Sequence, residues 1–164
     1  MADRTIQERL QPSLLDRLTA DAPEERLERR ESRVIAVRRL RELIRRDLAW
    51  LLNTTNQERR FGEEFPNVAT STLNFGVQEV AGEFDTGQRA VATREAIKLA
   101  IERFEPRIVA NSVRVDLRQP EDASDPLIYF DIRADMWAQP LPMELYMRSE
   151  NNIVTGELKL ERVS

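Results

Sequence analysis

The apolar residues of this chain change their spacing once along its length, from a helical period to a strand period. Up to about residue 104 they recur every three or four positions, which is typical of amphipathic helices. From residue 113 they alternate with polar residues, which is typical of half-buried strands. Helices first and strands afterwards predict an α+β fold, in which two main helices plus short helices pack on a mostly antiparallel four-stranded sheet.

Two segments carry the strongest helical pattern. The first runs from about Ser32, which suits an N-cap, to about Asn53, and it sets an apolar stripe against a row of arginines. The second begins after Asp85, in a spacing typical of a capping box, and runs to Phe104, where Pro106 stops it. The residues expected to face inward from this second helix are Ile97, Leu99 or Ala100, Ile101 and Phe104.

Shorter helices are expected on either side of the first long one. Pro66 opens a short helix over residues 67–73, and four leucines near the start of the chain share one helix face. Residues 1–33 are therefore expected to form an N-terminal extension with a short amphipathic helix, and residues 34–164 a single α+β domain. The four leucines are Leu10, Leu14, Leu15 and Leu18.

The last third of the chain contains four segments with alternating polarity, each expected to be a strand with one buried face. Two prolines between the second and third segments cannot donate ladder hydrogen bonds, so this crossing is expected at a corner or an edge. The apolar positions of the four segments are Val113, Val115 and Leu117; Ile128, Phe130, Ile132, Ala134 and Met136; Met143, Leu145 and Met147; and Leu158 and Leu160.

The composition removes most enzyme chemistry. The chain contains no cysteine and no histidine, which excludes thiol nucleophiles, Cys/His zinc sites, histidine bases and the Ser-His-Asp triad, and no cofactor or metal is expected. Carboxylate chemistry remains, because two carboxylates about 5–10 Å apart can hydrolyse a glycoside. With 29 acidic residues in the chain, however, a loop holding five of them is expected without any catalytic purpose. The five candidates are Glu63, Glu64, Glu79, Glu83 and Asp85.

Charge and hydropathy limit the kinds of partner. The net charge of −4 argues against nucleic acid, and no apolar run approaches the roughly 20 residues that span a bilayer. Without a secretion signal the chain is expected to be cytoplasmic. Arginines outnumber acids over residues 24–46, and acids outnumber bases over 120–164. This pattern suits a part that meets different neighbours with different surfaces, although two oppositely charged halves of one fold also attract each other.

One short motif stands at the end of the second helix. Pro106 ends that helix, so Glu105 and Arg107 are expected at a sharp change of chain direction. From there a charged side chain can project from a rigid base toward a partner. The simpler interpretation is a helix stop flanked by two surface charges.

An ordered set of motifs then resembles a known family. The chain is similar to the small baseplate subunits of bacterial type VI secretion systems, the TssE family, which belongs with the lysozyme-like baseplate wedge proteins of contractile phages. The resemblance covers most of the chain and makes the functional interpretation of the Glu-Pro-Arg triplet the preferred one. Its motifs are 11–18, 45–54, Phe65-Pro66, 71–76, Glu105-Pro106-Arg107, 137–142 and Leu145-Tyr146.

The resemblance implies a structural, non-enzymatic part that joins the baseplate wedge to the first ring of the contractile sheath. It implies that Glu105, Pro106 and Arg107 hold the wedge together. It also implies that strands of the sheath add to the terminal strands of this chain. The residues expected in these sheath-docking strands are Met143, Leu145, Met147, Leu158, Lys159 and Leu160. The implied partners are the wedge subunits TssF, TssG and TssK and the sheath subunits TssB and TssC, at the inner face of the cytoplasmic membrane. A lysozyme-like peptidoglycan hydrolase remains the alternative.

Overall fold

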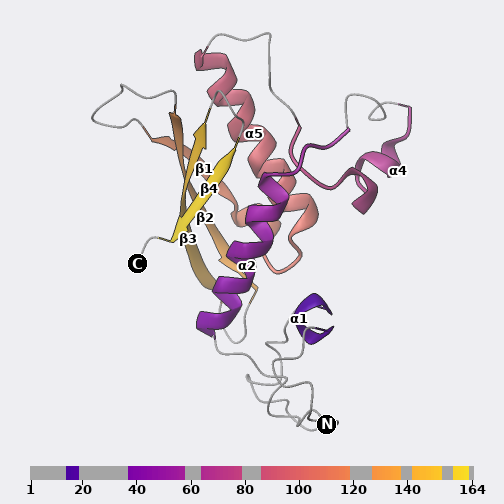
Figure 1. Ribbon diagram of the computed structural model, residues 1–164, viewed down its shortest axis with the longest axis vertical. Coiled ribbons are helices and arrows are strands. Elements are labelled where there is room, and N and C mark those ends of the chain that lie inside the picture. The colour runs from indigo at the N-terminus through magenta and orange to yellow at the C-terminus, as the bar shows by residue number, and fades with distance from the viewer. Residues whose placement is uncertain are drawn as a thin grey trace, which may run out of the picture.

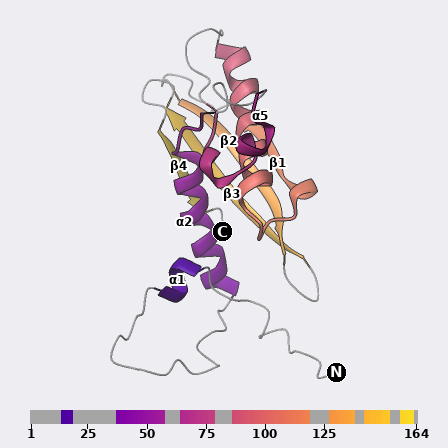
Figure 2. The same cartoon turned by 90° about the vertical axis from the view of Figure 1, so that its right-hand side faces the viewer.

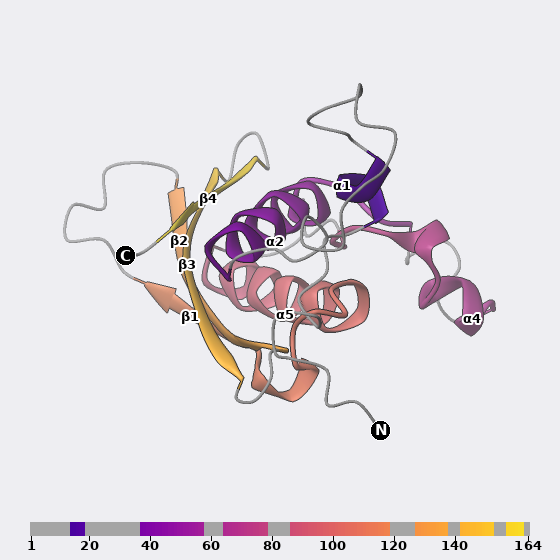
Figure 3. The same cartoon turned by 90° about the horizontal axis from the view of Figure 1, so that it is seen from below.

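Two long helices cover one face of a four-stranded antiparallel sheet (Figures 1 and 3). The computed structural model describes residues 14–18, 37–57, 64–78, 86–118, 127–137, 142–152 and 157–162. Within them the α-helices are α1 (Leu14–Leu18), α2 (Val37–Leu52), α4 (Pro66–Ala69) and α5 (Thr86–Phe104). Short 3₁₀ helices are η3 (Thr72–Asn74) and η4 (Ala110–Ser112). The strands are β1 (Arg114–Arg118), β2 (Leu127–Met136), β3 (Met143–Asn152) and β4 (Leu158–Arg162). This confirms the predicted α+β class.

The sheet follows the order of the chain. Its strands lie in the order β1-β2-β3-β4, and every neighbouring pair is antiparallel. The long strands β2 and β3 occupy the centre, and the five-residue strands β1 and β4 form the two edges. Each strand therefore has a fixed inner face toward the helices and an outer face away from them (Figure 3).

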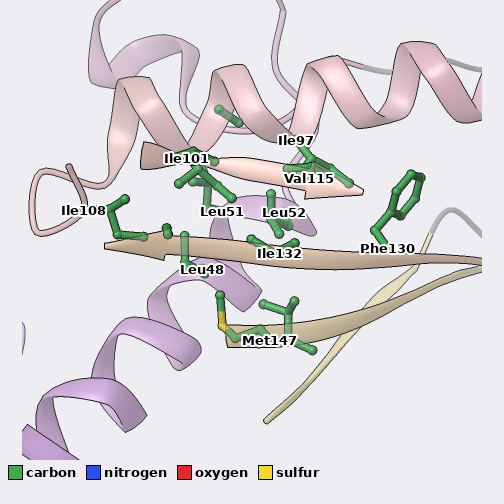
Figure 4. Close-up of a cluster of buried hydrophobic side chains, with 14 of the residues drawn as sticks. Leu48, Leu51, Leu52, Ile97, Ile101, Ile108, Val115, Phe130, Ile132 and Met147 are labelled. Carbon is green, nitrogen blue, oxygen red and sulfur yellow. The ribbon is translucent and has the colours of Figure 1, made fainter. Parts of the chain in front are cut away.

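The core lies between this inner face and the two long helices. Leu48 and Leu51 of α2 and Ile101 of α5 meet Ile132 of β2 and Met147 of β3, all fully or nearly fully buried (Figure 4). The apolar residues of the helices, which recur every 3.6 positions, and those of the strands, which recur every two, thus form one core. Each helix and each strand buries its single apolar face there.

Both long helices confirm their predictions within the described residues. The segment 86–104 is helical throughout, and 37–52 is helical, whereas the candidate caps Ser32 and Asp85 lie outside the described residues. The open choice between two inward positions on α5 is decided for Ala100, which is buried, while Leu99 is 41% exposed. The predicted helix over 67–73 is divided into α4 and η3.

One other expectation needs correction. Leu117 lies on the same face of β1 as buried Val115, but it is 46% exposed because it stands near the end of an edge strand with a neighbouring strand on one side only. Leu15 and Leu18 are in a helix as expected, yet both are exposed, with Leu18 at 75%. Leu10 lies outside the described residues.

None of the helices in the described ranges is long and apolar enough to cross a membrane.

Candidate functional site

The Glu-Pro-Arg triplet forms the turn that joins α5 to the sheet. The backbone N–H of Glu105 donates to the Ile101 carbonyl and closes the last turn of the helix. After the exposed Pro106, Ile108 donates back to the Glu105 carbonyl and forms an isolated antiparallel bridge with Met136 of β2. The turn is therefore anchored at one end to α5 and at the other to the sheet.

Glu105 and Arg107 bind each other across this turn. The Glu105 side chain is 5% exposed, and its Oε1 accepts hydrogen bonds from the Arg107 backbone N–H at 3.0 Å and from Arg107 Nε at 2.7 Å. Arg107 Nη2 donates to Asp47 Oδ2 of α2 at 2.7 Å. The triplet thus holds α2 and α5 together, and Arg107 is only 22% exposed.

A second arginine extends this network to α1. Arg46 donates to Asp47 Oδ1 at 2.7 Å and to Asp16 Oδ1 at 2.6 Å, and its guanidinium lies 5.0 Å from the centroid of the Trp50 ring. The charge pairs therefore link α1, α2 and the α5–β1 turn, and α1 lies beside α2 (Figure 2).

Both arginines hold their protons more strongly than usual. Burial lowers the pKa of Arg107, but the hydrogen bond and charge of Glu105, followed by those of Asp47, raise it above its ordinary value. At Arg46 the hydrogen bond to Asp16 is the largest contribution and raises the pKa. Stability from a raised pKa is fully present below the ordinary value and is lost only as the pH rises through the folded-state value. These contributions therefore stay constant across neutral pH.

The expectation that Glu105 and Arg107 project toward a partner is wrong for the described structure. Glu105 is buried and Arg107 is mostly buried, and both form hydrogen bonds within the chain, although Arg107 Nη1 has no partner among the described residues. Pro106 alone of the three is exposed. Sequence reasoning missed Asp47, because a carboxylate 60 positions before its arginine carries no local signal in the sequence.

The terminal strands place all their named apolar side chains toward the helices. Leu145, Met147, Leu158 and Leu160 are buried and Met143 is half-buried, while Lys159 is exposed on the other face. The side chains of the four buried residues therefore pack in the core and do not face a partner. What β4 presents to a partner is the backbone of its free edge.

The hydrogen-bond pattern identifies which backbone groups face that edge. The Asn152 N–H donates to the Glu157 carbonyl, so these opposed residues form a hydrogen-bonded pair. Because bonded and non-bonded pairs alternate in an antiparallel ladder, Lys159 and Glu161 direct their N–H and C=O groups to β3. Leu160 and Arg162 direct theirs outward. Lys159 was expected in the strand that contacts the sheath. Its backbone N–H and C=O are instead used in hydrogen bonds to β3.

The carboxylate candidates are mostly outside the described residues. Glu64 is exposed, whereas Glu63, Glu79, Glu83 and Asp85 are not described. In the parts of the chain that the structure describes, no group of three or more Asp and Glu residues could hold a metal ion.

One comparison with known proteins found a match. A family model described as baseplate wedge protein gp25 matches residues 38–141, which is more than half of the chain. The match runs from the start of α2 to just before β3 and includes the Glu-Pro-Arg turn. A search of curated proteins and a search of solved structures found no match.

Proposed function

Since the chain belongs to the gp25 family of baseplate wedge proteins, we propose that it joins the baseplate wedge of a type VI secretion machine to the first sheath ring and templates sheath assembly. At the coarser level the protein is a baseplate wedge component of a contractile injection system. The observation that carries the finer proposal is the outer edge of β4, where no strand of the described residues pairs with the outward N–H and C=O groups of Leu160 and Arg162.

The proposed wedge interface is the corner built by Glu105, Pro106 and Arg107. Glu105 and Arg107 act by holding the turn against Asp47 of α2, and Pro106 supplies exposed surface. The Arg107 carbonyl also accepts a hydrogen bond from the backbone N–H of Trp137, whose side chain is exposed. The partners proposed for this corner are the wedge subunits TssF, TssG and TssK.

The proposed sheath partners are TssB and TssC, which would add a strand to β4. Strand addition draws its affinity from backbone hydrogen bonds, so it needs outward N–H and C=O groups at the edge. The apolar residues of this site then act indirectly, because they pack β3 and β4 on the core. They are Met143, Leu145, Met147, Leu158 and Leu160. The assembly is proposed to lie at the inner face of the cytoplasmic membrane, with 34–164 as its domain and 1–33 as an extension.

Proline at position 162 tests the edge. Arg162→Pro removes an N–H that faces outward, away from β3, so its melting temperature should stay close to that of Arg162→Ala while sheath extension is abolished. Arg162→Ala, which keeps the N–H, should still support extension. The measurement is fluorescent sheath imaging together with co-purification of wedge subunits.

The companion change Glu161→Pro serves as the opposite control. It removes an N–H that points to β3, so it should lower the melting temperature as well. Normal sheath extension by a folded Arg162→Pro protein would place the docking strand elsewhere. The segment 127–137 is excluded as that site, because β2 lies between β1 and β3.

The hydrolase alternative has a direct test. We expect no release of muropeptides from peptidoglycan by the purified protein, because a structural subunit needs no acid and nucleophile pair. Glu64→Gln and Asp85→Asn variants provide the controls. Release above buffer that disappears in either variant would overturn the purely structural function.

A further inference from the structure

The side chain of Asn53, just past the end of α2, occupies the first outward position of β4. Its Oδ1 accepts a hydrogen bond from the Leu158 N–H at 2.9 Å, and its Nδ2 donates to the Leu158 carbonyl at 2.8 Å. The other Nδ2 proton is donated to the Ala49 carbonyl of α2 at 2.8 Å. Three hydrogen bonds thus fix this amide between a helix end and a strand edge.

The two bonds to Leu158 reproduce what a neighbouring strand would make. Leu158 stands opposite Asn151 in a non-bonded pair, so its N–H and C=O both point away from β3. A primary amide offers one acceptor and one donor side by side, as an opposing residue of a strand does. The binding of Leu158 by Asn53 also confirms independently which β4 groups face outward.

We propose that Asn53 is a register stop for the strand that adds to β4, an inference that rests on the proposed sheath-docking function. With Leu158 already bonded, the outward groups that remain for the incoming strand are those of Leu160 and Arg162, which have no backbone partner among the described residues. Displacing the amide would break both bonds to Leu158. The incoming strand is thereby prevented from sliding two residues toward Leu158, which is the smallest slip that keeps each side chain on its own face.

The first arm of the test uses the protein alone. In Asn53→Ala the amide proton of Leu158 should exchange with solvent at least about tenfold faster, as measured residue by residue by NMR. Thr54→Ala is the matched control, because it removes a comparable helix-end bond, Thr54 Oγ1 to the Trp50 carbonyl at 2.7 Å, without touching β4. An unchanged Leu158 exchange rate in Asn53→Ala would overturn the proposal.

The second arm measures the register with purified sheath subunits. Because the chain has no cysteine, Glu161→Cys gives a single exposed thiol beside the edge. Disulfide formation with single cysteines placed along the terminal strands of a cysteine-free sheath subunit reports which residues are opposed. We expect one dominant cross-link in the parent and in Thr54→Ala, and in Asn53→Ala a second cross-link displaced by two residues.

The outcomes separate this inference from the function on which it rests. A single unshifted cross-link in Asn53→Ala would overturn the register role while supporting strand addition. No cross-link at any position in the parent would overturn strand addition and the register role with it. Asn53→Asp, which keeps the Oδ1 acceptor and loses the Nδ2 donor, guards against a folding defect and should give an intermediate amount of the displaced cross-link.

Discussion

Arg107→Asp is expected to destabilise the protein by roughly 3 kcal/mol, the cost of breaking a largely buried ion pair by removing one partner. The change would leave Glu105, which is 5% exposed, beside a second carboxylate and would remove the hydrogen bond to Asp47. The α5–β1 turn would lose its tie to α2 as well. If this variant no longer binds the wedge, the cause would therefore be a distorted Glu-Pro-Arg turn.

The measurement is denaturant unfolding followed by circular dichroism, alongside co-purification with wedge subunits. Arg45→Asp is the matched control, because Arg45 is exposed on α2 two residues before Asp47, and it should shift stability by no more than about 0.5 kcal/mol. An Arg107→Asp protein with parental stability that no longer binds the wedge would contradict the structural role of the ion pairs with Glu105 and Asp47, and Arg107 would then be a direct contact of the wedge.

Gly76→Ala is expected to cost at least about 2 kcal/mol, because the position combines a strained backbone with a closed environment. Gly76 has φ +131°, and a Cβ built there would lie 2.3 Å from the Thr54 carbonyl oxygen. The surrounding backbone is tied by the Val77 N–H donating to the Thr54 carbonyl at 2.7 Å and the Asn56 N–H donating to the Val77 carbonyl at 3.0 Å. The main chain cannot move away without breaking this bridge.

Thermal unfolding measures the effect, and a second glycine provides a control of opposite sign. Gly87 is exposed in α5 and has no positive φ, so Gly87→Ala should stabilise the protein by about 0.4–1 kcal/mol. Equal stabilisation by Gly76→Ala would show that the contact with Thr54 is absent in solution. A loss there would also disturb residues 53–57, which follow α2 and include the proposed register stop.

The spacing of apolar residues by itself determined the fold class and the buried faces of most elements. A helix buries one stripe and a strand buries alternate residues, so the positions of Ile97, Ile101, Phe130 and Ile132 could be read directly from their periods. The same period separates Ala100 from Leu99, because Ala100 lies three residues after Ile97 and four before Phe104 on the buried stripe, whereas Leu99 falls on the opposite side of α5. The sequence also located the Glu-Pro-Arg turn, since a proline beyond the first turn of a helical pattern ends or kinks the helix.

Tertiary structure alone decided what the polar groups of the site do. Arg107 meets Asp47 60 residues away, and Asn53 meets Leu158 105 residues away. A hydrogen bond has no sequence period, because its partners are chosen by how the finished helices and sheet bring their ends together. The alternation of residues in β4 likewise did not show which backbone groups face the docking edge. Lys159 was expected to contact the docking strand, but pairing with β3 directs the backbone N–H and C=O of Lys159 to β3 and those of Leu160 outward. Side-chain periods follow from the chain, but the direction of a strand's free N–H and C=O groups follows from which neighbour it pairs with.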